Sequence, residues 1–149
     1  MGLLYYRINS LKTAESYFNE ALEKDPTNAI AYNNLGYIYL IRQKFNIAED
    51  YLKKALLYDN KHIQAYFNLS DLYDLTNRQH EAINLFLALK NIEPDLPSVD
   101  YNLGKLYYKL NIRDKAADYF NRYINNAEKN DDYYDEAEEL LKKIRFFGK

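Results

Sequence analysis

The sequence predicts an all-α fold made of one helix–turn–helix unit repeated along the chain. The first observation is an alanine that returns every 34 residues, at Ala14, Ala48, Ala82 and Ala116. The second is a tyrosine with the same period, at Tyr5, Tyr39, Tyr73 and Tyr107. A third register holds small residues, at Gly2, Gly36, Ser70 and Gly104. A fixed period of this length is typical of repeat proteins, so the sequence predicts a stack of similar units.

Each period divides into two amphipathic helices. In residues 29–62, Leu35 and Tyr39 fall at helical spacing in the first half, and Ala48 and Leu52 in the second. A polar segment, residues 42–46, separates the two halves and predicts a turn. Proline lacks an N–H and restricts the residue before it, so Pro26 and Pro94 mark where second helices end.

The registers divide the chain into five consecutive parts within one continuous domain. Residues 1–28 form a partial repeat that is entered partway, and full repeats follow over 29–62, 63–96 and 97–130. Residues 131–149 carry apolar residues at helical spacing against a face of Glu and Lys, at Tyr134, Ala137, Leu140, Leu141 and Ile144. Such a segment predicts the polar capping helix that ends a helical repeat array.

These registers resemble the tetratricopeptide repeat family. Its pattern places an aromatic, Leu-Gly, Tyr, Ala, an aromatic, Ala and Pro at fixed offsets. Residues 29–62 match at Tyr32, Leu35, Gly36, Tyr39, Ala48, Leu52 and Ala55, and residues 63–96 match at Tyr66, Leu69, Ser70, Tyr73, Ala82, Phe86 and Pro94. Residues 97–130 match at Leu103, Gly104, Tyr107, Ala116 and Phe120. There Asp100 replaces the first aromatic and Tyr123 the second alanine, so we expect looser packing in this repeat.

The resemblance implies a right-handed α-solenoid whose first helices line a concave groove that binds a peptide, a helix or a partner domain. The small and tyrosine registers are then scaffold, and the groove positions carry function. They are Asn33, Asn34, Tyr37, Phe67, Asn68, Asp71, Asp74, Tyr101, Asn102, Lys105, Tyr108 and Lys109. Buried aromatics dominate interface energies, so Tyr37, Phe67 and Tyr101 are expected to supply affinity and the charged residues orientation.

Three asparagines, Asn34, Asn68 and Asn102, share one groove register. A side-chain amide donates and accepts hydrogen bonds, so such a row could bind the backbone of an extended ligand. The alternative is that each amide bonds to a neighbouring repeat. The Lys and Arg that would grip a C-terminal carboxylate are missing from the matching groove positions, Asn33, Tyr37, Ser98 and Asn102, so no carboxylate clamp is expected.

Composition argues against several other functions. The net charge is -2 and the chain has no cysteine. No basic surface for nucleic acid is therefore expected, and disulfides and thiolate chemistry are excluded. His62 and His80 have no positioned acid or nucleophile, and the acidic run over 135–139 is typical of a solvated helix face. We expect no catalytic residue, no cofactor and no metal site.

The sequence therefore predicts a non-enzymatic scaffold with a protein or peptide partner, no nucleic-acid or membrane partner, and a cytoplasmic location by default. Two alternatives remain open. One is a structural module that forms a homo-oligomer through the incomplete N-terminal repeat, where Leu3, Leu4 and Ile8 lack part of their usual cover. The other is an accessory segment of a larger enzyme.

Overall fold

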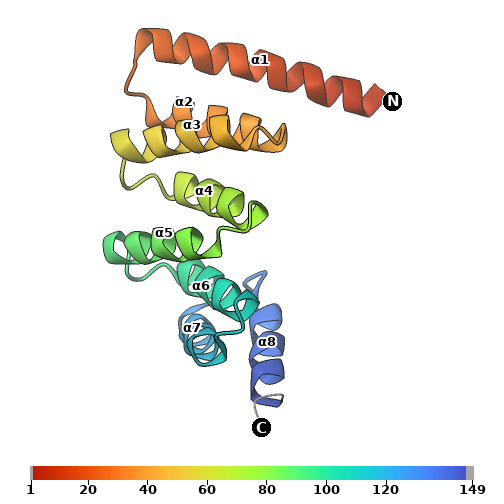
Figure 1. Cartoon of the computed structure of the whole chain (residues 1–149), viewed down its shortest axis with the longest axis vertical. Coiled ribbons are helices and arrows are strands. Elements are labelled where there is room, and N and C mark those ends of the chain that lie inside the picture. Colours follow the sequence, from red (N-terminus) through yellow and green to blue (C-terminus); the bar gives the residue numbers. More distant parts are fainter. Residues whose placement is uncertain (1, 147–149) are drawn as a thin grey trace. The chain divides into compact units, whose positions relative to one another are not determined.

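The structure, a computed structural model, describes residues 2–146, and side chains from residue 10 onward. Within this range the chain consists of α-helices joined by short turns, without strands (Figure 1). The helices are α1 (Gly2–Lys24), α2 (Ala29–Ile41), α3 (Phe45–Tyr58), α4 (Ile63–Leu75), α5 (Gln79–Ile92), α6 (Pro97–Lys109), α7 (Arg113–Asn126) and α8 (Tyr134–Phe146). They divide into two compact units, Met1–Asn77 and Arg78–Lys149. The predicted all-α class is confirmed.

The turns repeat with the period of the sequence. Gln43, Asn77 and Asn111 each have a positive φ, of 57°, 58° and 57°. They lie 34 residues apart, directly after α2, α4 and α6. This left-handed conformation reverses the chain, and Asn adopts it at lower cost than most residues.

The first unit is built around the α2–α3 hairpin. A Cβ atom on Gly36 would lie 2.6 Å from Leu52 Cγ and 3.3 Å from the Ala48 carbonyl oxygen, so only glycine fits where these helices cross. Tyr39 stacks on Tyr51 with ring centroids 5.5 Å apart. Gly36, from the small register, therefore lies where α2 and α3 cross, which agrees with the scaffold role expected for that register.

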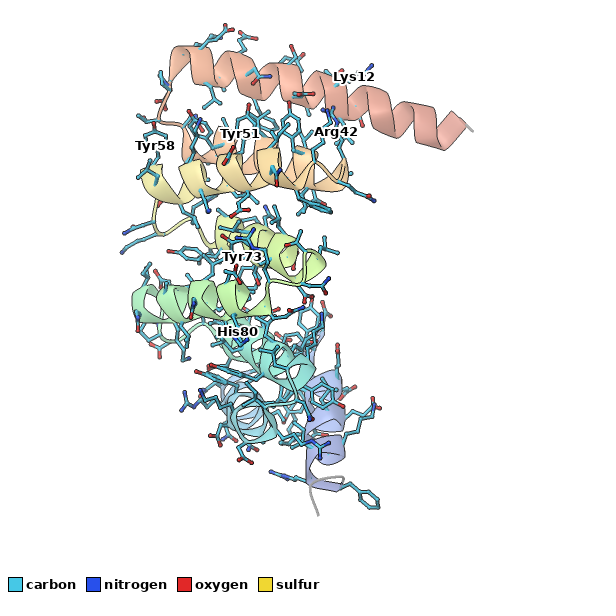
Figure 2. All side chains as sticks on the ribbon, in the orientation of Figure 1. Lys12, Arg42, Tyr51, Tyr58, Tyr73 and His80 are labelled. Atoms are coloured by element: carbon cyan, nitrogen blue, oxygen red, sulfur yellow. The ribbon has the colours of Figure 1, made fainter. Side chains whose placement is uncertain are left out.

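Tyrosine hydroxyls join consecutive elements of the first unit. Tyr39 donates to Glu15 Oε1 of α1 at 2.5 Å, and Tyr73 donates to Glu49 Oε1 of α3 at 3.2 Å. In both pairs the glutamate lies 24 residues before the tyrosine. Arg42, which Figure 2 shows at the end of α2 beneath α1, adds a second bond to Glu15 at 2.6 Å. Tyr39 and Tyr73 are therefore scaffold, as predicted, whereas Tyr5 of the same register lies outside the described side chains.

The α6–α7 hairpin of the second unit repeats this packing. A Cβ on Gly104 would lie 2.7 Å from the Phe120 ring, and Tyr107 stacks on Tyr119 at 5.5 Å. Phe120 is 0% exposed and Tyr123 is 1% exposed. The expectation of looser packing in residues 97–130 is therefore wrong, because Tyr123 fills the core instead of crowding it.

The N-terminal segment differs from the expected partial repeat. Asn9 lies in the register of Gln43, Asn77 and Asn111, but α1 continues through it as one helix and extends past the α2–α3 hairpin (Figure 1). A separate helix over residues 2–8 would be under two turns long and marginal, whereas continuation adds one hydrogen bond per residue. The predicted contact site at Leu3, Leu4 and Ile8 lies outside the described side chains.

The segment predicted to cap the array, residues 131–149, contains the helix α8 over Tyr134–Phe146, and residues 147–149 lie outside the described range. This helix packs against α7 and buries Ala137, Leu141 and Ile144. Glu138 stands in the register that holds Gly36, Ser70 and Gly104 in the repeats. A glutamate side chain at this position would keep a further helix from approaching as closely as α3 and α7 approach their partners.

Candidate functional site

Four predicted groove residues meet in one pocket of the first unit. The pocket has a volume of about 270 Å³ and lies between the first helices of two consecutive repeats, α2 and α4. We call it the amide pocket, since amides make up most of its lining: Asn33, Asn34, Tyr37, Gln64 and Asn68. An amide-lined hollow offers donors and acceptors together but no fixed charge, which suits peptide backbone or amide groups better than ions.

Two of these amides already bond to each other. Asn68 Nδ2 donates to Asn33 Oδ1 at 2.8 Å, and both residues are 5% exposed. Gln64 Nε2 donates to Asn68 Oδ1 at 3.2 Å. The pair joins α2 to α4, so it forms the floor of the amide pocket and fixes its shape.

The other two members of the asparagine register behave differently. Asn34 Nδ2 donates to the Ile30 carbonyl at 2.8 Å, and Asn102 Nδ2 donates to the Ser98 carbonyl at 2.7 Å, each within its own helix. The alternative of bonding to a neighbouring repeat therefore holds for Asn68 alone. Sequence spacing could not distinguish these cases, because the register is the same and only the acceptors differ.

An exposed apolar stripe borders the amide pocket along α2. Ile30 is 62% exposed, Tyr37 47% and Ile41 40%. They recur at spacings of seven and four residues, which places them on one face of the helix. Asn34 lies on the same face between Ile30 and Tyr37, so polar and apolar groups alternate there.

The remaining groove residues of the first unit lie on α4 outside the amide pocket. Phe67 and Asp74 are half-buried, and Asp71 is exposed. The predicted groove residues of α4 therefore do not all line the pocket, since only Gln64 and Asn68 of this helix do so.

Tyr101, predicted as a ligand-binding aromatic, belongs to the core of the second unit. It is 2% exposed and stacks on Tyr133 at 4.6 Å. Its hydroxyl donates to Glu136 Oε2 of α8 at 2.6 Å. Burial, together with the bond to Glu136, raises the pKa of Tyr101 well above its usual range. The prediction that Tyr101 is available to a ligand is wrong, because the segment that begins the cap covers it.

The signal for this cover was present in the sequence. Glu136 lies 34 residues after Asn102, and the Tyr101–Glu136 bond spans 35 residues, as does the Asn33–Asn68 bond. The cap therefore uses the same contact that joins α2 to α4. Lys105 is also engaged there, with Nζ 5.1 Å from the Tyr101 ring centroid and 3.8 Å from Glu136 Oε1.

The last two predicted residues, Tyr108 and Lys109, line a second pocket of about 340 Å³. We call it the basic pocket, defined by Tyr108, Lys109, Asn111, Arg113, Lys143 and Ile144. Arg113 and Lys143 were missed from the sequence. The sequence signal for Lys143 was its distance from Lys109, which is one repeat length.

Comparison with known proteins agrees with this architecture. Tetratricopeptide repeat models match residues 17–50, 63–96 and 98–129. The chain belongs to the tetratricopeptide repeat family, and membership makes it a scaffold for protein interaction. No curated protein matches it in sequence.

Several solved structures share the fold. YrrB, described as a TPR protein with an unusual peptide-binding site, is 18% identical with a TM-score of 0.73, over 97% of this chain and 73% of that chain. A MamA structure is 21% identical with a TM-score of 0.70, over 98% and 93%. A second MamA structure is 22% identical with a TM-score of 0.69, over 97% and 86%. None of the helices in residues 2–146 combines the length and the hydropathy that a membrane-spanning segment requires.

Proposed function

We propose that this protein is a non-enzymatic adaptor that binds an extended segment of a partner protein across α2 and α4. The amide pocket beside an exposed apolar stripe is the observation that supports this. The bond from Asn34 to Ile30 uses one of its two amide hydrogens, which leaves capacity for a ligand. An extended segment has unpaired backbone groups that amides can bind, whereas a helix has satisfied its own.

The apolar side chains of the same segment would rest on the stripe. Tyr37 lines the amide pocket and is also 47% exposed, so it can contact both the backbone and a side chain of the ligand. Tyrosine offers a large contact area with few rotatable bonds, which is why it often carries interface energy. The peptide-binding site named for YrrB is compatible with a peptide ligand here.

The test begins with a partner captured on the immobilised chain and continues with its binding segment as a synthetic peptide. Tyr37→Ala should weaken peptide binding by at least about 1 kcal/mol, because it removes the central aromatic. Leu57→Ala is the matched control, since Leu57 is 75% exposed but lies on the second helix of the same hairpin. Loss of binding in the Leu57 variant and normal binding in the Tyr37 variant would refute the proposal.

The self-association alternative also stays a proposal. It predicts an increase in mass with concentration in sedimentation equilibrium. A chain that remains monomeric at the highest soluble concentration would refute it.

A further inference from the structure

One face of α1 is partly open where the corresponding faces of α3 and α7 are closed. Ala14 and Phe18 are half-buried, and Tyr17 beside them is 67% exposed. In α3 and α7 the residues in the registers of Ala14 and Phe18 are all 0% exposed: Ala48, Leu52, Ala116 and Phe120. There the preceding helix covers this face, but α1 continues as one helix through Asn9 and extends past the α2–α3 hairpin (Figure 1).

The α2–α3 hairpin shows what covers such a face. Gly36 of α2 lies against Leu52 of α3, and Tyr39 of α2 stacks on Tyr51 of α3 with ring centroids 5.5 Å apart. The α6–α7 hairpin has both contacts in the same registers. The covering helix therefore offers a glycine to the large apolar residue and a tyrosine ring to the tyrosine next to it.

Residues 2–8 carry the same two complements. Gly2 and Tyr5 lie one period before the glycine and tyrosine of α2, and Phe18 and Tyr17 lie one period before the partners of those residues in α3. Within one continuous α-helix, however, Tyr5 and Tyr17 are about 18 Å apart along the axis. Residues 2–8 therefore cannot cover the open face of their own helix while α1 is unbroken.

We propose that residues 2–8 of a second copy cover this face, so that two α1 helices run antiparallel and each completes the first hairpin of the other. The paired registers place the two-fold axis near Ser10, midway between Gly2 and Phe18. Exchange of identical elements between copies is a low-cost route to a symmetric dimer. This dimer gives the self-association proposed above a definite surface, and it does not involve the amide pocket.

The continuous helix favours exchange over closure within one chain. Closure would need a turn at Asn9, where the corresponding residue Gln43 has a φ of 57°. It would also leave residues 2–8 as a separate helix of under two turns, which is marginal. In the exchanged dimer the same residues remain part of the 23-residue α1.

Disulfide trapping tests the pairing, because the chain has no cysteine of its own. A Cβ atom on Gly36 would lie 2.6 Å from Leu52 Cγ. This Cγ is bonded to Cβ, so the two Cβ atoms of the pair come within the reach of a disulfide, roughly 3.5–4.5 Å. Full chains with Gly2→Cys and with Phe18→Cys should therefore form a disulfide-linked dimer when they are mixed and oxidised. Neither variant alone should do so, since the two-fold axis keeps like positions apart.

Both substitutions on one chain distinguish exchange from closure. After oxidation, the exchanged dimer gives twice the monomer mass on a non-reducing denaturing gel. A chain that folds residues 2–8 onto its own α1 gives the monomer mass and no free thiol. That second result, or a mixture of the single variants without cross-links, would overturn the proposal.

A charge on the open face should dissociate the dimer. The wild type should sediment as a dimer at equilibrium, and Tyr17→Asp should raise the dissociation constant at least about tenfold, because it buries an unpaired carboxylate in the interface. Ser16→Asp is the matched control. Ser16 is exposed and lies two residues from Phe18, hence on the opposite side of α1, so its substitution should change the constant less than about twofold.

A wild type that remains monomeric, or a dimer that Tyr17→Asp leaves intact, would also overturn the proposal. The second of these results would leave self-association through another surface in place. Neither result would bear on peptide binding, whose test uses the Tyr37 and Leu57 variants.

Discussion

Lys90 and Asp100 form an ion pair, with Nζ 2.7 Å from Oδ1, where the preceding repeat has Leu56 and Tyr66 in the same registers. Tyr66 donates its hydroxyl to the Asn60 carbonyl at 3.1 Å. Lys90 Nζ donates at 3.3 Å to the carbonyl of Pro94, which precedes Asp100 by the same six residues. The lysine and aspartate together therefore replace the tyrosine, including its bond to the loop.

The pair predicts an unequal response to single substitutions. Asp100 has a side chain that is 5% exposed, and Lys90 one that is 21% exposed. Lys90→Leu should cost about 3–5 kcal/mol because it strands a buried carboxylate, and Asp100→Ala should cost less because Lys90 can reach water. The double variant Lys90→Leu, Asp100→Tyr should recover most of the loss. Denaturant unfolding measures all three, and a double variant as unstable as Lys90→Leu would contradict this.

Gly36 should tolerate no side chain. A Cβ atom there would lie 2.6 Å from Leu52 Cγ, which is a branch point and not the flexible end of its side chain. Gly36→Ala should therefore destabilise the fold by about 1–3 kcal/mol despite the better helix propensity of alanine. Thermal melting tests this, with Ser16→Ala as an exposed helical control. A stabilised Gly36 variant would show that α2 and α3 do not cross here.

Tyr101 should affect stability instead of ligand binding. It contacts Tyr133 and Tyr123 and bonds to Glu136, so Tyr101→Ala should cost about 3–5 kcal/mol. Tyr101→Phe keeps the ring and loses only the hydroxyl, and should cost about 1–2 kcal/mol by leaving Glu136 with one bond fewer. Circular dichroism melts measure both. A Tyr101→Ala variant that melts like the wild type would restore the groove assignment.

The sequence was sufficient for the repeat unit because each register has one packing role. The registers predicted that Gly36 and Gly104 are scaffold, but they did not predict that Leu52 and Phe120 are the side chains that face them. Groove positions carry no such constraint. Tyr37 and Tyr101 both belong to the predicted groove, yet one is 47% exposed and the other 2% exposed. The difference comes from the segment that follows Asp131, which a pattern confined to one repeat does not describe.

The contact between α1 and α2 should weaken in acid. Hydrogen bonds from Tyr39 and Arg42 lower the pKa of Glu15 below its usual 4.5. A carboxyl group whose pKa is lower in the folded state than in the unfolded state stabilises the fold at pH values above the unfolded pKa. This stabilisation disappears as the pH falls through the folded pKa. The melting temperature of the wild type should therefore drop below about pH 4.5 more than that of Glu15→Gln. Parallel profiles for the two proteins would exclude this role.

The contact between α1 and α2 should also weaken at high pH. The bond to Glu15 raises the pKa of Tyr39 to about 12. A tyrosine whose pKa is higher in the folded state than in the unfolded state stabilises the fold at pH values below the unfolded pKa, which is near 10. This stabilisation is lost as the pH rises from the unfolded pKa to the folded pKa. Tyr39→Phe should flatten the melting profile in this window, while Tyr17→Phe, at a residue that is 67% exposed, should not.

Asn68 and Asn34 share a register, but they should respond differently to alanine. Asn68→Ala removes the donor to Asn33, whose amide is 5% exposed, and should cost about 1–3 kcal/mol by leaving a buried polar group unpaired. Asn34→Ala removes a bond to its own helix at an exposed position and should change stability by less than about 0.5 kcal/mol. Asn34 is therefore the residue whose loss tests ligand binding without breaking the Asn33–Asn68 bond, and chemical denaturation distinguishes the two variants. If Asn34→Ala proves as destabilising as Asn68→Ala, the Asn33–Asn68 bond does not fix the junction between α2 and α4.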